Sequence, residues 1–286
     1  MPPLYTKALI IGATSGIGAS LAAKLLASGT SVIITGRRQP LLDTFIAEHP
    51  PPSPNLTITA LPLDITDLPA LPAFAASVLA AHPDLDCVIL NAGIQRAFDF
   101  SRPAAVAPLL AGPFAAELTT NYVGPVHVAT AFLPHLQALG RRASLVFVGA
   151  SLGLVPTLVR TPGYNASKAA LHSWVVALRQ QLRDAAGSAS AAVRVVEVFP
   201  PAVQTELHDA KHQPDMVNGG EIGMPLAAFT ERMYEGLARG DDEFAVGHAE
   251  AWLAEGGFES QRRKIFEEQH VVLKDVLAKY LRKEGS

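Results

Sequence analysis

The sequence predicts an α/β protein built on a doubly wound, mostly parallel sheet of seven strands with helices on both faces. Short apolar runs of strand character alternate with helical segments along the chain, as in consecutive βαβ units. A glycine-rich turn joins the first of these runs to the first helix. A content of 49% hydrophobic and 17% charged residues suits a large buried core. We therefore expect a single domain over residues 1–286.

The expected elements follow one another without a repeat or a linker. Strands are expected at residues 7–11, 31–35, 56–63, 86–90, 143–149, 193–199 and 243–246. Helices are expected at 19–28, 69–82, 117–139, 162–182, 225–239 and 261–282. Residues 49–55 form a proline-rich connection, and the polar segment 206–223, which has no clear periodicity, is the expected substrate lid. This order predicts a Rossmann-type sheet with right-handed crossovers.

Charge and composition exclude several classes of protein. The net charge is −3 without a long basic run, so the electrostatic footprint of a nucleic-acid-binding protein is missing. No stretch approaches the ~20 apolar residues of a membrane span, and the N-terminus reaches glycines too early for a secretory signal. The single cysteine, Cys87, cannot form an intrachain disulfide and is expected to be a small buried hydrophobe. We expect a cytoplasmic protein without a metal site.

The first turn reads Gly12-Ala13-Thr14-Ser15-Gly16-Ile17-Gly18 and lies between a strand and a helix. Glycines allow close backbone approach, and the following helix N-terminus offers unpaired N–H groups and a positive dipole. This pattern predicts a cradle for the pyrophosphate of a dinucleotide. The alternative is a tight turn that needs glycine only for its geometry.

Charged residues at the ends of the next two strands are candidates for contacts with the adenosine part of such a dinucleotide. Arg37 and Arg38 follow the second strand with no acid beside them, which favours the 2′-phosphate of NADP(H), although both could simply be solvated. Asp64, followed by Ile65, ends the third strand, where it could contact the ligand or cap a helix. The fourth strand ends in Asn91-Ala92-Gly93.

Tyr164 and Lys168 are four residues apart in an expected helix, so their side chains should share one face. A cation ~4 Å away at an effective dielectric of ~20 is worth about 4 kcal/mol, enough to bring the phenol pKa towards neutral pH. The pair is therefore a candidate acid–base couple. Ser151 follows the fifth strand, and Asn121 lies in an apolar helix where its amide needs partners. The alternative is a helix with a half-buried tyrosine and a solvated lysine.

Taken together, these motifs resemble the short-chain dehydrogenase/reductase family over residues 7–246. Gly12–Gly18 resembles its cofactor turn, Asn91-Ala92-Gly93 its strand-four motif, and Pro200–Thr205 the segment that grips the nicotinamide carboxamide. Ile11 and Leu90 depart from the family pattern, which often has threonine and asparagine there. Residues 224–252 further resemble a subgroup of uncharacterised oxidoreductases named after a bacterial cell-wall alanylation operon, the DltE-like proteins.

The resemblance implies a catalytic tetrad of Asn121, Ser151, Tyr164 and Lys168. Tyr164 would exchange a proton with the substrate oxygen, Ser151 would hydrogen-bond the same oxygen, and Lys168 would lower the phenol pKa and hold the ribose. Asn121 would fix a water. The implied contacts with NADP(H) are Gly12, Thr14, Ser15, Gly16, Ile17, Gly18, Arg37, Arg38, Asp64, Ile65, Asn91, Ala92, Gly93, Tyr164, Lys168, Pro200, Val203 and Thr205.

The expected substrate is a small carbonyl or secondary alcohol, and it is expected to be apolar. Residues 95–100, 151–160 and 206–223 would line its pocket, with Phe98, Phe100, Leu152, Leu154, Val155 and Leu158 as apolar members. Apolar faces on the helices at 117–139 and 162–182 predict a homodimer or homotetramer, as is common in the family. The rival functions are an NAD-linked alcohol dehydrogenase and a non-catalytic protein that senses or binds NADP.

Overall fold

The computed structural model describes residues 2–186 and 193–281. The chain divides into two compact units, Met1–Val246 and Gly247–Ser286. The first unit contains the sheet and every residue of the predicted site. A single domain over all 286 residues stays a prediction.

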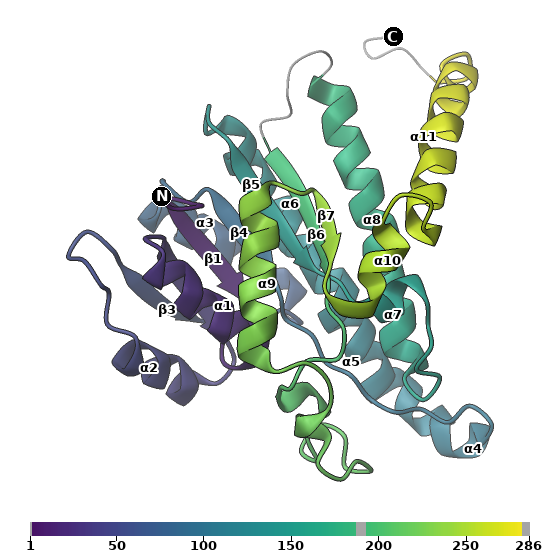
Figure 1. The fold of residues 1–286 in the computed structure, drawn as a ribbon, viewed down its shortest axis with the longest axis horizontal. Helices are drawn as coiled ribbons and strands as arrows, with labels where there is room; N and C mark the ends of the chain where they lie inside the picture. Colours follow the sequence, from purple (N-terminus) through teal and green to yellow (C-terminus); the bar gives the residue numbers. More distant parts are fainter. Residues whose placement is uncertain (1, 187–192, 282–286) are drawn as a thin grey trace. The chain divides into compact units, whose positions relative to one another are not determined.

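A seven-stranded sheet forms the centre of the first unit, with the strand order β3-β2-β1-β4-β5-β6-β7 (Figure 1). All six strand pairs are parallel. The strands are β1 (Lys7–Ile11), β2 (Ser31–Gly36), β3 (Ile58–Pro62), β4 (Cys87–Leu90), β5 (Ala143–Val148), β6 (Val193–Phe199) and β7 (Glu243–Ala245). The predicted Rossmann-type fold class is confirmed.

The register aligns the carboxyl ends of the central strands. Ile11 at the end of β1 pairs with both Thr35 of β2 and Leu90 of β4, and Leu90 pairs with Phe147 of β5. The order of strands reverses between β1 and β4, which is where such sheets bind ligands. The turns that leave these strands therefore lie at one edge of the sheet.

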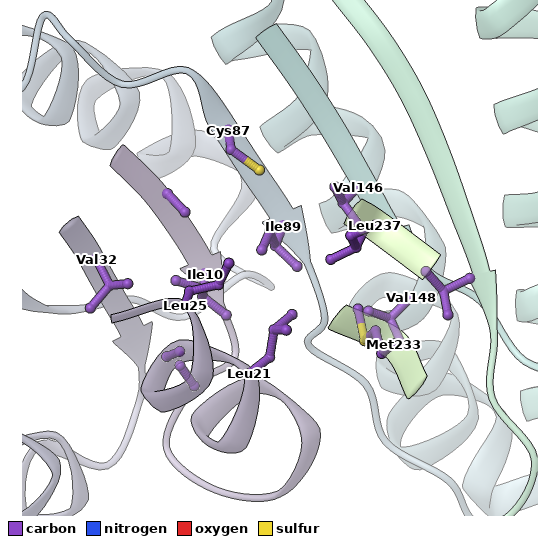
Figure 2. Close-up of a cluster of buried hydrophobic side chains, with 14 of the residues drawn as sticks. Ile10, Leu21, Leu25, Val32, Cys87, Ile89, Val146, Val148, Met233 and Leu237 are labelled. Carbon is purple, nitrogen blue, oxygen red and sulfur yellow. The ribbon is translucent and has the colours of Figure 1, made fainter. Parts of the chain in front are cut away.

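Two hydrophobic clusters cover the two faces of the sheet, because successive strand residues point to opposite sides. Ile10, Ile34 and Ile89 belong to one cluster, which Figure 2 shows, and they pack with side chains of α1 (Gly16–Ala27), α2 (Gln39–Glu48) and α9 (Leu226–Arg239). Leu9, Ile33 and Val88 belong to the other, with α3 (Leu71–Ala81), α6 (Gly124–Ala138) and α8 (Pro162–Ala186). Each face thus has its own core.

The helices depart from the expected ones in a few places. The expected helix 117–139 is a run of α5 (Ala115–Leu118), the π-helical turn η4 (Thr119–Val123) and α6. The helices α2, α4 (Pro103–Val106) and α7 (Ser151–Leu154) were not expected. The remaining short helical turns are η1 (Leu68–Ala70), η2 (Ala107–Leu109), η3 (Leu110–Phe114), η5 (Glu206–His208), η6 (Gly219–Glu221) and η7 (Gly247–Ala249).

The second unit contains α10 (Glu250–Leu253) and α11 (Phe258–Leu277). The expected C-terminal helix, 261–282, therefore begins and ends earlier, and its last residue, Arg282, lies outside the described residues. Within the described parts of the chain, no helix has the length and apolar character to cross a membrane. The same residues contain no cluster of three metal-binding side chains.

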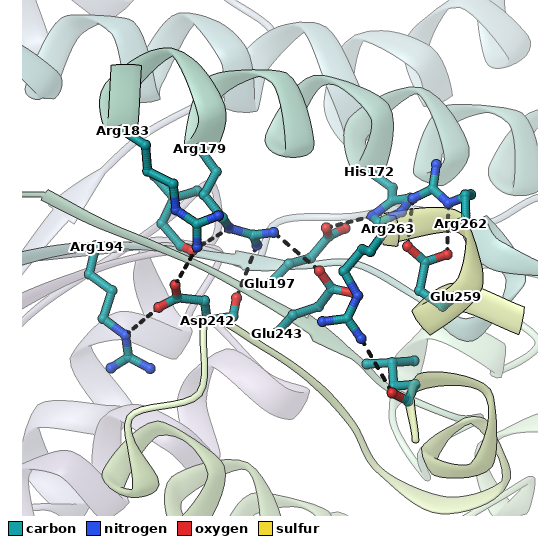
Figure 3. Close-up of polar contacts among 12 residues, drawn as sticks. His172, Arg179, Arg183, Arg194, Glu197, Asp242, Glu243, Glu259, Arg262 and Arg263 are labelled. Carbon is teal, nitrogen blue, oxygen red and sulfur yellow. Dashed lines mark hydrogen bonds and ion pairs between the residues drawn. The ribbon is translucent and has the colours of Figure 1, made fainter. Parts of the chain in front are cut away.

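Polar contacts attach α8 to the strands β6 and β7 (Figure 3). Arg179 donates from Nε to Val195 O at 3.0 Å and from Nη1 to Glu243 Oε2 at 3.1 Å. About two helical turns before Arg179, His172 Nδ1 lies 2.7 Å from Glu197 Oε2 of β6, and both side chains are buried. These bonds fix the position of α8, the helix that carries Tyr164 and Lys168.

Phe132→Ala should lower the free energy of unfolding by about 3–5 kcal/mol, because Phe132 is fully buried in the core of one face. The same substitution at Phe100, whose side chain is half exposed, should cost less than about 1 kcal/mol. Denaturant titration followed by circular dichroism measures both. Equal losses would show that the helix face carrying Phe132 contributes no core packing.

Candidate functional site

The glycine-rich turn and the end of β4 are in direct contact. Gly12 has a φ of +89°, and a Cβ built on it would lie 2.6 Å from Ala92 Cα. Asn91 Nδ2 donates to Gly12 O at 2.7 Å, and Ala92 N donates to Ile11 O at 2.8 Å. Only glycine fits here, so the turn can pack directly against the end of β4. Gly16, Ile17 and Gly18 begin α1.

The Arg38 guanidinium donates hydrogen bonds to three side chains of the protein. Its Nη2 donates to Thr14 Oγ1 at 2.9 Å and to Ser15 Oγ at 2.7 Å, and its Nη1 donates to Glu206 Oε2 at 2.7 Å. Ser15 Oγ also donates to the same oxygen at 2.9 Å. Arg38 therefore has a nearby acid after all, supplied by a residue far along the sequence. Its positive charge and Ser15 hold the pKa of Glu206 below its usual value although burial opposes this.

Arg37 is exposed and makes no hydrogen bond or ion pair with a described residue. It is close enough to Asp64 to help lower the pKa of that carboxyl, together with hydrogen bonds from Thr66, although partial burial works the other way. Asp64 Oδ1 accepts from Thr66 N and Oγ1 at 2.9 and 2.7 Å. The next helical turn, η1, starts after Asp67, so Asp64 is not its cap. Ile65 is buried.

Ser151, Tyr164 and Lys168 are all nearly fully buried at this edge. Tyr164 and Lys168 lie on α8, where the Lys168 ammonium is 5.7 Å from the centre of the Tyr164 ring. Lys168 Nζ donates to Val148 O, at the end of β5, at 2.7 Å. Ser151 opens α7, and its N donates to Pro200 O after β6 at 3.1 Å. The turns after β5 and β6 and the helix α8 thus meet.

Burial pushes both titratable groups of this pair towards their neutral forms. The pKa of Tyr164 is raised well above its ordinary value by desolvation, and the negative charge of Glu117 adds to this. The expectation that Lys168 brings the phenol pKa towards neutral pH is therefore wrong for this geometry. Desolvation also lowers the pKa of Lys168 to about 8, although Glu197 opposes the shift.

Asn121 lies in the π-helical turn η4 and is fully buried. Its Oδ1 accepts from Ile94 N at 2.9 Å, and its Nδ2 donates to Ile94 O at 2.8 Å and to Ser167 Oγ at 3.0 Å. The amide thereby fastens the loop after Gly93 to α8. A Cβ on Gly93 would lie 3.8 Å from Lys168 Nζ, which places this loop beside the buried ammonium.

The segment after β6 connects the two halves of the site. Val203 forms an isolated bridge with Met224, and Thr205 Oγ1 accepts from Leu207 N at the start of η5. In the expected lid, 206–223, the buried Gln213 donates to Gln95 Oε1 at 2.9 Å and accepts from Arg160 Nη1. The three segments expected to line the substrate pocket are therefore joined by hydrogen bonds; the mobility of the lid stays a prediction.

Two acids near the predicted site were not singled out from the sequence. Glu206 and Arg38 are 168 positions apart and meet only in the tertiary structure, so no local sequence pattern indicates their contact. Glu117 carried a signal, since it is the only acid between Asp99 and Asp184 and lies one helical turn before Asn121.

Comparisons with known proteins identify the family and the fold. The family model described as short chain dehydrogenase matches residues 6–215. The uncharacterised oxidoreductase DltE of Bacillus subtilis is 34% identical over 235 residues, which cover 82% of this chain and 85% of that protein. A short-chain dehydrogenase from Sphingobium yanoikuyae in complex with NADPH superposes with a TM-score of 0.71 at 21% identity, covering 98% of both chains. One from Burkholderia phymatum in complex with NAD also gives 0.71, at 20% identity, covering 86% and 90%. The chain belongs to the short-chain dehydrogenase/reductase family.

Proposed function

We propose that the protein is an NADP(H)-dependent oxidoreductase that transfers hydride between the nicotinamide and a carbonyl or secondary alcohol. The observation that carries this proposal is the meeting of Ser151, Tyr164 and Lys168 at the carboxyl edge of the sheet, beside the loop that Asn121 fastens. A hydroxyl, a phenol and an ammonium buried together can polarise a carbonyl and move a proton.

The residues around the glycine-rich turn fit a dinucleotide. Gly12 lets the turn pack directly against the end of β4, and the first N–H groups of α1, which starts at Gly16, can bind a phosphate. Arg37 is exposed and has no bonded partner among the described residues, so its guanidinium is available to a phosphate, while Arg38 donates hydrogen bonds to Thr14 and Ser15. The remaining proposed contacts, Pro200, Val203 and Thr205, follow β6 on the same side.

In the proposed reaction the bound nicotinamide supplies or accepts the hydride. Tyr164 gives its proton to the substrate oxygen during reduction and takes it back during oxidation. Ser151 donates a hydrogen bond to that oxygen, and Lys168, held by Val148 O, keeps a positive charge near the phenol. Asn121 keeps the loop after β4 in place, and its proposed hold on a water remains part of the proposal.

We propose an apolar substrate, because the ring of Phe114 lies edge-on to both Phe98 and Phe100, which belong to one of the expected pocket segments. The alternative cofactor is NAD, which the Burkholderia phymatum protein holds. A binding protein without catalysis would have no use for a buried tyrosine and lysine at this position, so we favour the enzyme. We also propose a cytoplasmic location, consistent with the free, buried Cys87.

Tyr164→Phe should abolish carbonyl reduction and leave NADPH binding nearly intact, because only the proton donor is lost. Absorbance of NADPH with a panel of apolar ketones and aldehydes measures turnover, and NADPH fluorescence measures binding. Tyr234→Phe, on α9, is the matched control and should retain activity. Turnover near that of the wild type in Tyr164→Phe would contradict the proposed mechanism.

Wild type should bind NADPH roughly ten- to hundredfold more tightly than NADH, the equivalent of one charge-assisted hydrogen bond to the 2′-phosphate. Arg37→Ala should remove most of this preference, and replacing both arginines with alanine should collapse it mainly by weakening NADPH binding. Arg38→Ala should weaken both cofactors, because it loosens the turn itself. Dissociation constants from calorimetry decide the matter, with exposed Arg142→Ala as control. Equal affinities for the two cofactors in the wild type would refute NADP specificity.

The protein should form a homodimer or homotetramer, because α8 leaves Ala166, Ala169 and Ala177 exposed along one side. Partners of this kind pack helix against helix at small residues. Light scattering at micromolar concentration should give a multiple of the 30.2 kDa chain mass. A species of only that mass would exclude the proposed assembly.

A further inference from the structure

A carboxyl that the proposed mechanism does not use is buried beside the site. Glu117, on α5, has no exposed surface. Its Oε1 accepts a hydrogen bond from Arg96 N at 2.8 Å. Glu117 lies one helical turn before Asn121, which bonds to Ile94 of the same loop. Glu117 and Asn121 therefore bind two residues of the same loop after β4, Arg96 and Ile94, which are two positions apart.

The second carboxyl oxygen of Glu117 has no hydrogen-bond partner among the described residues. It lies against Gly163, the residue before Tyr164, where a built Cβ would be 2.3 Å away, and the ring of Phe114 closes the same space. Any side chain at position 163 would collide with this oxygen. The absence of a Cβ there lets the carboxyl approach the start of α8.

The charged or titratable groups that face Glu117 are Arg96, from the loop after β4, and Tyr164, from α8. Arg96 favours the ionised carboxylate, but its Nη1 is itself buried and without a partner among the described residues, so the two side chains form no ion pair. Desolvation outweighs the attraction and raises the pKa of Glu117 to about 7. Both charge states are therefore accessible near neutral pH.

We propose that Glu117 is a positioning residue that holds the loop after β4 through Arg96 and whose charge controls how readily Tyr164 gives up its proton. The inference rests on the proposed function. In the proposed carbonyl reduction, the bound nicotinamide would supply hydride to the carbonyl carbon, the Tyr164 O–H bond would break as a substrate O–H bond forms, and the phenolate left behind would be reprotonated from solvent. A negative Glu117 opposes that phenolate, whereas a protonated Glu117 does not.

The test variant is Glu117→Gln, which keeps an acceptor oxygen for Arg96 N and removes the charge. Wild-type kcat/KM for carbonyl reduction should fall by roughly three- to tenfold as the pH rises through about 7, the pKa of Glu117. The variant should lack this step and should exceed the wild type at pH 8. Glu117→Ala, which also loses the loop contact, should be slower at every pH. Exposed Glu48→Gln is the matched control and should keep the wild-type profile.

Two further readouts need no substrate and so separate this inference from the proposed function. In carbon NMR of protein labelled at the Glu carboxyls, one resonance missing from Glu117→Gln should titrate near pH 7. Because ionisation of a buried group with a raised pKa costs folded-state stability as the pH rises, Glu117→Gln should melt above the wild type at pH 8, and the gap should shrink towards pH 5. A carboxyl that titrates with the exposed ones, or a melting difference independent of pH, would overturn the inference.

Discussion

Every group of the candidate site depends on the parallel pairing of β1 with β4, of β4 with β5 and of β5 with β6. Parallel strands end at the same edge, so Gly12 contacts Asn91 and Ser151 contacts Pro200 although the members of each pair are far apart in the sequence. The backbone bonds between Ala92 and Ile11, and between Ser151 and Pro200, extend this pairing into the turns. The side chains of α8 can then reach the edge because Arg179 and His172 hold that helix to β6 and β7.

Burial of the site residues also influences their protonation states. Water is excluded from Tyr164 and Lys168, so the phenol keeps its proton and the ammonium releases its proton more easily than usual. A protonated phenol is the form that carbonyl reduction needs. The phenolate needed for alcohol oxidation requires positive charge beside the ring, and the Lys168 ammonium, 5.7 Å from the ring centre, does not by itself offset the desolvation of the phenol.

The local sequence pattern was sufficient to predict the sheet, because apolar runs, glycine turns and helical spacing are visible in residues that are close together in the sequence. The spacing of Tyr164 and Lys168 likewise predicted their common face correctly. The helix 39–48 was missed although its sequence is amphipathic, and the π-helical turn at Asn121 is visible only in the hydrogen bonds of the folded chain. The direction of the shift in the Tyr164 pKa could not be predicted either, because it depends on the burial of the phenol. The ion pair of Arg38 with Glu206 joins residues 168 positions apart, so it too could not be read from the sequence.

Glu117 and Glu206 show how a chain can alter a site without changing its motifs. Each places a carboxylate close to the site: Glu206 bonds to Arg38 and Ser15, and Glu117 lies beside Gly163, where its charge adds to the desolvation that raises the pKa of Tyr164. Both contacts come from residues outside the motifs, so Ser151, Tyr164 and Lys168 stay the same whether or not the contacts are present. Proteins with identical motifs can therefore differ in cofactor affinity and pH dependence, because those properties follow from the charges packed around the motifs and not from the motifs alone.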